Sequence, residues 1–495
     1  MKTSQKIILA VGILLVGLIA VILVRTWTFS SKQIAVPSVA LEQVDQAQAV
    51  RHLSEAVQLQ TVSYDDAVKN DTNQFVLLRN SIEAQYPAIQ QHLKRTIINN
   101  YSLLYEWTGS HPEQKPILLT AHMDVVPANA AEWHVDPFKG EVKDGFIWGR
   151  GTLDDKGSLF SILEAVEHLI ENGYQPERTL YLGFGDDEEA GTPAGLTGAK
   201  MIAEYLKTKG IHPETVLDEG GVIMDGDASL IKGKPIGLIG VAEKGFLTLK
   251  ITATGPGGHS MMPPNDTTIF LLSRALNAID HDRFPSSLDG TVSLTFDYLG
   301  PEMPFGQKLV FANRWLFGGL IISQLEKTGL TAAMLHTTIA PTVIQGGSKE
   351  SVLPTSAFAL VNLRIMPGQT SQEVIEHVKK SISDPRISVE PYGGVIHEAT
   401  PLSGLNDKGY VLLAQTIRET YPDVMVAPVL MTGSTDSRYY KDVADDIYRF
   451  SPYVYAPGDM NRPHGLNERI SIDSYIHMIQ FYVRFIRNSS GSASD

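Results

Sequence analysis

The sequence predicts an α/β protein in which a mixed, largely parallel sheet with helices on both faces carries an inserted, smaller α+β unit. Three observations lead to this fold class. Most of the first 25 residues are apolar, strand-like runs then alternate with helical patterns, and period-two alternation begins near Gly245. Alternating strands and helices are typical of parallel strand pairs. The apolar start predicts an N-terminal transmembrane helix ahead of the folded region.

The apolar segment Ile7–Val24 carries no charge. At ~1.5 Å per residue it nearly spans a hydrocarbon core of about 30 Å. A signal peptide has a shorter apolar region, about 7–15 residues, and a prompt small-residue cleavage site. Here Arg25 and Trp27 follow instead, and tryptophan favours the membrane interface. We expect a single-pass anchor over residues 1–30 with the catalytic domain outside the cytoplasm; a cleaved signal would make the protein secreted.

The larger domain is expected over residues 46–244 and 397–487, after a polar linker at 31–45. Its first half shows short buried strands separated by helices with an apolar face. The expected strands are Ile117–Ala121, Thr179–Phe184 and Thr215–Leu217, and the expected helices are Leu159–Ile170 and Met201–Lys209.

The inserted unit is expected over residues 245–396, as a two-layer lid of a kind that also serves for dimerisation. Its strands should alternate between buried and exposed side chains, as half-exposed strands do. The tail at 488–495 is rich in Ser and Gly and is expected to be flexible. The expected strands are Phe246–Ala253, Thr291–Phe296 and Phe358–Arg364, and the expected helix is Glu373–Ile382.

Composition excludes several functions. The chain has 495 residues, which allows two to four domains. Its formal net charge of −14 argues against a nucleic-acid partner, because such partners need a basic face. It has no cysteine, which excludes disulfides, thiolate metal sites and a cysteine nucleophile. Any metal ion must therefore be held by His, Asp and Glu.

Candidate ligands follow the expected strands as His122-Met123-Asp124, Asp186–Glu189 and Asp218-Glu219, and Asp154 precedes a helix. Ligands gather at the carboxyl ends of strands in α/β sheets. Several carboxylates placed there need a cation, and with imidazole present and thiolate absent Zn²⁺ is favoured, with Mn²⁺ or Co²⁺ as substitutes. Each cluster alone is more often structural. The Gly149-x-Gly151 turn could instead bind phosphate, but the third glycine of a dinucleotide motif is missing.

Together these motifs resemble the M20 metallopeptidase family, in its branch of carboxypeptidase S-like and N-acyl-amino-acid hydrolases. The similarity extends over almost all of residues 50–485. The matching segments are LLTAHMDVVP, GRGTLDDKG, GDDEEAG, VLDEGG, GPGGHSMMPP, NLRIMPG, GSTDSRYY and HGLNERI.

The resemblance implies two Zn²⁺ ions per chain. Carried over by motif, Asp154 bridges both ions, and the fifth ligand is Asp218 or Glu219, of which Asp218 is preferred. The implied metal ligands are therefore His122, Asp154, Glu189, Asp218 and His464.

The resemblance also implies catalytic and substrate-binding roles. Glu188 would be the general base, Asp124 would orient His122, and His259 of the smaller unit would stabilise the oxyanion. Arg364 and Asn313 match positions that hold the substrate's free carboxylate. Asp436 and Arg438 are expected to brace the site.

The expected activity is hydrolysis of the amide bond next to a C-terminal amino acid, in small peptides or N-acyl amino acids. An aminopeptidase or a deacetylase of the same family is the alternative within enzymes. An inactive surface protein that binds metal or peptides is the alternative outside them. Relatives often dimerise through the smaller domain, and some complete the site with a neighbour's histidine, so a homodimer is a further expectation.

Overall fold

A computed structural model of the chain describes residues 3–64, 66–190, 198–229 and 231–491. Its centre is a 10-stranded sheet in the order β1-β2-β6-β3-β7-β17-β9-β8-β18, with β16 also pairing with β9. The pairs β6–β3, β3–β7 and β7–β17 are parallel, which confirms the predicted fold class. The strands are β1 (Lys94–Ile98), β2 (Ser102–Trp107), β3 (Ile117–His122), β6 (Leu180–Gly185), β7 (Thr215–Asp218), β8 (Ile223–Met224), β9 (Ile236–Glu243), β16 (Met425–Met431), β17 (Asp446–Arg449) and β18 (Val454–Tyr455).

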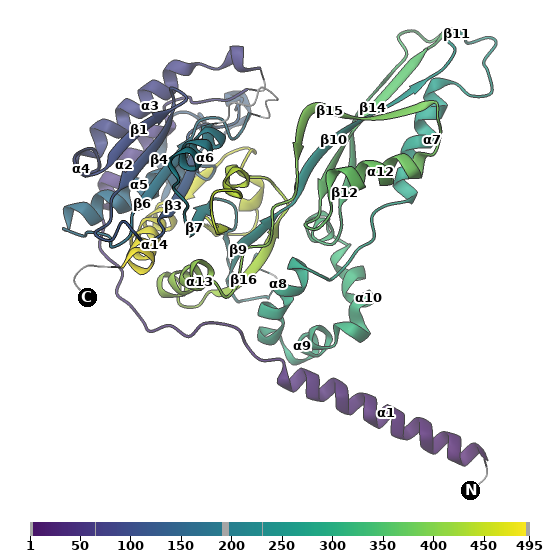
Figure 1. Ribbon diagram of the computed structural model, residues 1–495, viewed down its shortest axis with the longest axis horizontal. Coiled ribbons are helices and arrows are strands. Elements are labelled where there is room, and N and C mark those ends of the chain that lie inside the picture. The colour runs from purple at the N-terminus through teal and green to yellow at the C-terminus, as the bar shows by residue number, and fades with distance from the viewer. Residues whose placement is uncertain (1–2, 65, 191–197, 230, 492–495) are drawn as a thin grey trace.

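Helices cover both faces of this sheet (Figure 1). Side chains of β3 alternate between two cores, with Ile117 and Leu119 in one and Leu118 in the other. Helices α5 and α14 fill the first core, and α6 fills the second, as the period-two pattern of a strand requires. The helices around the sheet are α2 (Gln46–Val57), α3 (Thr72–Gln85), α4 (Pro87–His92), α5 (Lys156–Glu171), α6 (Gly198–Lys209), α13 (Lys408–Thr420) and α14 (Ile472–Ser490). A small separate sheet joins β4 (Glu141–Lys143), β5 (Phe146–Trp148) and β19 (Arg469–Ser471).

A separate antiparallel unit extends from the central sheet (Figure 1). Its 4-stranded sheet has the order β12-β14-β10-β15, and helices α7 and α12 cover one face. Along β10 every second side chain is buried, as the sequence predicts. We call this whole antiparallel unit the lid. The two-stranded ribbon β11–β13 forms its outer end. Its elements are β10 (Gly245–Thr254), β11 (Gly258–His259), α7 (Thr268–His281), β12 (Thr338–Gly346), β13 (Val352–Leu353), β14 (Ser356–Ile365), α12 (Ser371–Ile382) and β15 (Ile387–His397).

The prediction of a strand at Thr291–Phe296 is wrong, because these residues form the first part of helix α8 (Thr291–Leu299). Val292, Phe296 and Leu299 are buried at helical spacing, against a core that includes β16 of the central sheet. Tertiary burial of that one stripe overrides the β-branched composition. Helices α9 (Phe305–Ala312), α10 (Arg314–Leu325) and α11 (Gly329–Ala333) follow.

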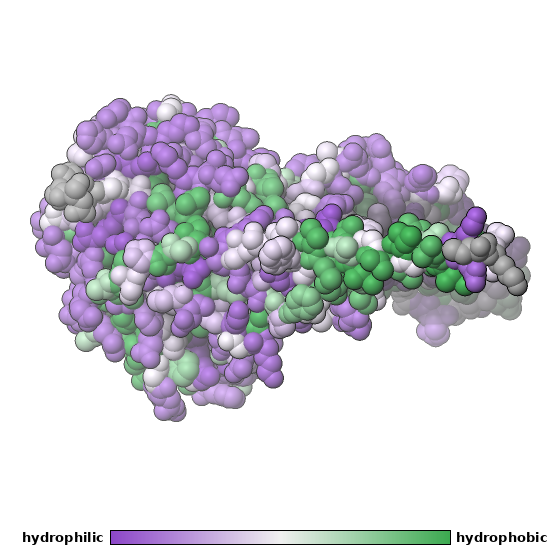
Figure 2. Space-filling model, turned by 90° about the horizontal axis from the view of Figure 1, so that it is seen from below, coloured by the Kyte–Doolittle hydropathy of each residue, from purple (hydrophilic) through white to green (hydrophobic). Residues whose placement is uncertain are grey.

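Helix α1 (Thr3–Thr28) projects from the body with its apolar side chains uncovered (Figures 1 and 2). Its most apolar window has a mean hydropathy of 3.4 and is not buried, so by length and composition it can cross a membrane. The segment after α1 is extended, and the Gln33 side chain bonds the backbone of Val426 in β16. At the other terminus α14 includes residues 488–490 of the predicted tail, and 492–495 lie outside the described residues.

Candidate metal and active site

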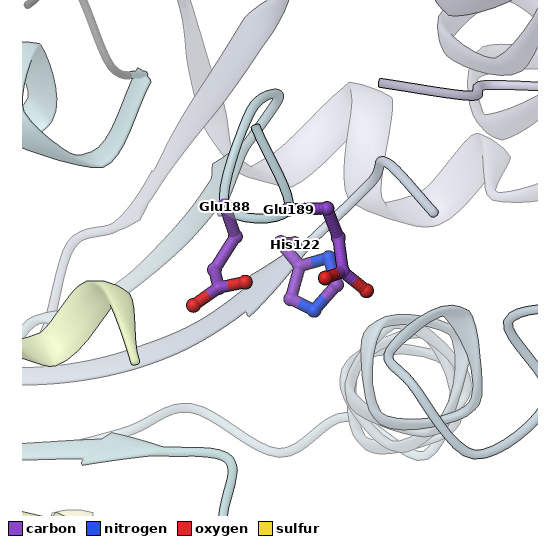
Figure 3. A group of neighbouring side chains, drawn as sticks. All are labelled: His122, Glu188 and Glu189. Carbon is purple, nitrogen blue, oxygen red and sulfur yellow. The ribbon is translucent and has the colours of Figure 1, made fainter. Parts of the chain in front are cut away.

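The candidate site lies where parallel strands β3, β6 and β7 end at the same edge of the central sheet. His122 is the last residue of β3, and Glu188 and Glu189 follow β6. Asp218 is the last residue of β7, and Glu219 follows it. Figure 3 shows the side chains of His122, Glu188 and Glu189 close together. The strand ends thus bring together residues that are far apart in the chain, as the sequence predicts.

Among the described residues, imidazole and carboxylate groups form three overlapping sets, in each of which the ligand atoms lie within 4.8 Å of one another. Each set holds one histidine and two carboxylates, a donor combination that suits Zn²⁺ and similar divalent ions. Because the sets share members, they could hold more than one ion side by side. The sets are His122–Glu188–Glu189, His122–Asp154–Glu219 and Asp154–Glu189–His464.

Asp154 lies between the two histidines. Its Oδ1 is 3.0 Å from Nε2 of His122, and its Oδ2 is 3.1 Å from Nε2 of His464. His464 also lies 3.0 Å from Oε2 of Glu189. This central place of one carboxylate is the arrangement expected of a bridging ligand.

Asp218 and Glu219 have different surroundings. Oε1 of Glu219 is 3.5 Å from Nε2 of His122, and Glu219 belongs to one of the three sets. Asp218 belongs to none of the sets found among the described residues. Its two carboxylate oxygens accept hydrogen bonds from the Thr120 hydroxyl, at 2.6 Å, and from the backbone N–H of Ser437, at 2.8 Å. The structure therefore places Glu219, and not the preferred Asp218, beside the candidate ligands.

Asp124 connects two parts of the site. Its Oδ1 is 3.3 Å from Nδ1 of His122, and its two oxygens accept hydrogen bonds from the backbone N–H groups of Glu188 and Glu189. Nδ1 of His122 is also 3.0 Å from the backbone carbonyl of Asp124, so one buried residue holds both the imidazole and the loop after β6. Such a partner fixes the orientation of a metal-binding histidine.

Arg150 and Glu468 form a second support, whose role was not predicted although both residues lie in the matching segments GRGTLDDKG and HGLNERI. Their buried ion pair is 2.6 Å long. Glu468 accepts hydrogen bonds from the backbone of Leu153 and Asp154, and Arg150 donates to the carbonyl of Gly465. The pair therefore ties the Asp154 turn to the loop that carries His464.

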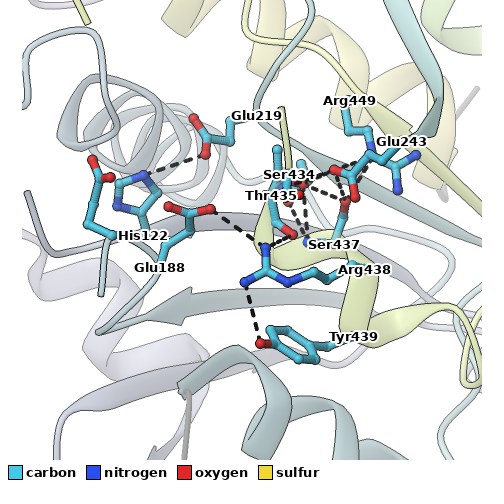
Figure 4. Close-up of polar contacts among 12 residues, drawn as sticks. His122, Glu188, Glu219, Glu243, Ser434, Thr435, Ser437, Arg438, Tyr439 and Arg449 are labelled. Carbon is cyan, nitrogen blue, oxygen red and sulfur yellow. Dashed lines mark hydrogen bonds and ion pairs between the residues drawn. The ribbon is translucent and has the colours of Figure 1, made fainter. Parts of the chain in front are cut away.

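Arg438 lies on the other side of Glu188, with Nη1 3.7 Å from Oε1 of that glutamate (Figure 4). Asp436, on the same short segment, is buried. Both positions fit the predicted bracing role. The segment itself is held by buried Glu243, the last residue of β9. Oε1 of Glu243 accepts hydrogen bonds from Thr435 and lies 2.9 Å from Nε of Arg449.

Arg364 lies at the base of the lid, near this segment. Its guanidinium lies over the Phe246 ring, 4.8 Å from the centroid, and Nη1 is 3.5 Å from Oγ of Ser434. No carboxylate of the described residues pairs with it. Burial lowers the pKa of Arg364, and the positive charge of neighbouring Arg438 lowers it further. A free carboxylate would be favoured here.

His259 and Asn313 are not brought to the site. His259 is exposed on the outer ribbon of the lid, where its Nδ1 accepts a hydrogen bond from the backbone of Met261 (Figure 1). Asn313 is buried, and its amide donates to Ile22 and Thr26 of helix α1. This side chain packs the N-terminal helix, so the structure gives no support to its predicted contact with substrate.

The electrostatics of the site favour a cation. Burial, with neighbouring acids, raises the pKa of Glu188 well above its usual range and that of Glu219 to about 8. Conversely, hydrogen bonds to Asp154 and Glu189 raise the pKa of His464 to about 11. Clustered carboxylates need positive charge nearby, and protons supply it where no metal ion is bound. Raised pKa values of the acids and of the neighbouring histidine are therefore typical of a metal site considered without its ion. The residues present therefore fit a metal centre.

The Peptidase family M20/M25/M40 model matches residues 118–488. The chain is 36% identical over 486 residues to "Probable carboxypeptidase S-like 2" from Dictyostelium discoideum, which covers 96% of this chain and 93% of that protein. It is 39% identical over 442 residues to "N-fatty-acyl-amino acid synthase/hydrolase PM20D1.1" from Danio rerio, covering 88% and 84%. The chain therefore belongs to the M20 family of metal-dependent hydrolases, within the group of carboxypeptidase S and N-acyl-amino-acid hydrolases.

The fold is shared with a solved relative. The M20 family metallo-carboxypeptidase Sso-CP2 from Sulfolobus solfataricus superposes with a TM-score of 0.64 at 18% identity, covering 89% of this chain and 98% of that one. At that identity the likeness concerns architecture. It agrees with the central sheet and separate lid described above.

We predict that zinc binding to the metal-free protein releases protons and weakens as pH falls. Metal ligands must be deprotonated, and His464, with a pKa raised to about 11, is protonated at neutral pH before metal binds. Below that pKa, each displaced proton costs about tenfold in apparent affinity per pH unit. Calorimetry at pH 7 in buffers of different ionisation enthalpy measures the number released. His464→Gln is the control that should release fewer, and zinc binding without proton release would contradict the prediction.

Proposed function

We propose that the protein is a two-zinc hydrolase that cleaves the amide bond joining an acyl or peptidyl group to a C-terminal amino acid. The observation that carries the proposal is the set of overlapping ligand groups centred on Asp154, with Glu188 beside them. His122, Asp154 and Glu219 would hold one ion, and Asp154, Glu189 and His464 the other. When bound, two such ions lower the pKa of a water molecule and polarise a carbonyl group.

Glu188 would act as the general base. It belongs to a set with His122 and Glu189, so it is within reach of the same small volume as the ligands. It accepts a proton from the attacking water and then delivers it to the leaving nitrogen. Its backbone N–H is held by Asp124, and Arg438 borders its carboxylate on the other side. At 3.7 Å, Arg438 forms an ion pair with Oε1 of Glu188 but no hydrogen bond, so the carboxylate is positioned and can still accept a proton.

Arg364 would bind the free carboxylate of the substrate. Its planar guanidinium offers a two-pronged contact that a lysine does not reproduce. Stacking on Phe246 and the absence of a carboxylate partner among the described residues leave it available. The N-fatty-acyl amino acids named for the Danio rerio relative and the peptides implied by a carboxypeptidase both end in this carboxylate.

The oxyanion role of His259 requires a movement of the lid or a second copy of the chain, because this histidine lies on the outer ribbon. A homodimer formed through the lid remains part of the proposal. We further propose that helix α1 is an uncleaved anchor that holds the catalytic domain outside the cytoplasm. Its length, with Trp27 after the apolar run, supports an anchor over a cleaved signal.

A substrate panel tests the activity and the role of Glu188 together. We expect the zinc-loaded full chain in detergent to release free amino acids from N-acyl amino acids or blocked dipeptides, and a chelator to stop this. Glu188→Gln should lower kcat by about 10²–10⁴-fold with zinc content unchanged. Mass spectrometry of the products and elemental analysis measure both quantities. Glu204→Gln, at an exposed position, is the control and should keep full activity. Full activity of Glu188→Gln would refute the mechanism. Release of N-terminal residues from the substrates would favour an aminopeptidase.

Glu219→Gln and Asp218→Asn separate the two candidates for the fifth ligand. We expect Glu219→Gln to lose one of the proposed ions, because an amide is a weaker ligand than a carboxylate. Asp218→Asn should retain both, since an amide can still bond Thr120 and the Ser437 backbone. Elemental analysis after dialysis gives the zinc content per chain. The opposite result would assign the ligand to Asp218.

Arg364→Lys keeps the positive charge and removes the planar fork. We expect kcat/KM for substrates with a free carboxylate to fall roughly 10–150-fold, since a hydrogen bond to a charged group contributes about 1.5–3 kcal/mol. The loss should shrink for the corresponding C-terminal amides. Arg274→Lys, in an exposed ion pair on α7, is the matched control. Equal losses on acids and amides would show that Arg364 does not bind the carboxylate.

A further inference from the structure

We infer that helices α9 and α10 form a membrane-seated platform, with exposed apolar side chains inserted into the lipid leaflet from which helix α1 emerges. The inference rests on the proposed anchor role of α1 and goes beyond the proposed activity. The relevant partner is the acyl-chain and headgroup boundary of a bilayer. The observations that carry it are the contact between α1 and the α9–α10 corner, the depth of that contact, and the exposed side chains beside it.

Helix α1 is docked on the corner between α9 and α10 by specific hydrogen bonds. The Asn313 amide donates to the carbonyl of Ile22 and to the hydroxyl of Thr26, each at 3.2 Å. Arg25 donates from Nε to the carbonyl of Ala312 at 3.4 Å. Asn313 and Thr26 are buried in this contact. The corner therefore has a defined position relative to the N-terminal helix.

The level of this contact along α1 places the corner at membrane depth. Ile22 lies inside the uncharged run Ile7–Val24, about 3 Å before its end at ~1.5 Å per residue. A spanning helix positions that turn at the boundary between hydrocarbon and headgroups. Because Asn313 bonds the backbone of Ile22, the α9–α10 corner must lie at the same level. A moderate tilt of the helix would not lift it clear of the interface.

The surface around this corner is apolar enough to lie there. Trp315, Leu316 and Leu320 of α10 are 55%, 43% and 52% exposed, and Phe305 of α9 is 65% exposed. After Arg314, helix α10 has no charged residue up to its end at Leu325. Large apolar side chains left bare on a helical face are typical of interfacial helices, which sink about 5–10 Å into the boundary region. Tryptophan is also enriched at that level.

A seated platform would also hold one edge of the central sheet close to the bilayer. Helix α8, which precedes α9, packs against β16 of the central sheet. A fatty-acyl amino acid, the substrate class named for the Danio rerio relative, partitions into the same leaflet. The platform would thus keep the proposed enzyme at the surface that concentrates such a substrate.

The absence of native cysteine allows a direct test in the full chain. Single variants Leu316→Cys and Leu320→Cys carry an environment-sensitive fluorophore and are reconstituted into vesicles of zwitterionic and anionic phospholipid. Phe270→Cys, on α7 of the lid and 61% exposed, is the matched control. We expect the α10 labels to be quenched by lipid-borne nitroxide and shielded from aqueous iodide. The control label should show the reverse.

Iodide quenching of the α10 labels equal to that of the Phe270→Cys label would overturn the inference. Labels shielded from both quenchers would overturn it as well, because they would indicate a second copy or another protein on this face. Hydrolysis of a short, soluble N-acyl amino acid checks that each variant is folded. If the unsubstituted chain lacks that activity, the proposed function fails while the quenching result still decides the position of α10.

Discussion

The gathering of carboxylates in one largely buried place is the constraint on which the rest of the structure depends. Within the described part of the chain, Asp154, Glu189 and Glu219 lie around two imidazoles, those of His122 and His464. Like charges at this spacing, away from water, cannot all stay ionised without a cation. The arrangement therefore fits a metal centre. Burial, with neighbouring acids, raises the pKa values of Glu188 and Glu219.

Two buried supports keep this unfavourable cluster in place. Asp124 holds His122 and the loop after β6, and the Arg150–Glu468 pair ties the Asp154 turn to the His464 loop. Both supports connect segments distant in sequence. A side chain that bonds two loops restricts the conformational freedom of both. The ligands are therefore aligned before any ion binds, and little rearrangement is needed when it does.

The lid joins the site through charge as well as through chain continuity. Glu243, where the central sheet passes into the lid, bonds the segment that carries Arg438, and Arg438 borders Glu188. Arg364 lies on β14 of the lid, opposite Phe246 of β10, and its guanidinium contacts Ser434 next to the same segment. A displacement of the lid would therefore move the contacts of the proposed base, Glu188, and of the proposed carboxylate-binding residue, Arg364, at the same time.

The sequence by itself determined the central elements, the motif residues at the strand ends and the apolar N-terminal helix, because periodicity and local motifs are properties of short segments. It did not determine that Thr291–Phe296 is helical, that His259 lies on the outer ribbon or that Asn313 packs α1. Nor did it choose between Asp218 and Glu219. Neighbouring residues at a strand end point to opposite sides, and only the tertiary partners Thr120, Ser437 and His122 decide which carboxylate faces the ligands.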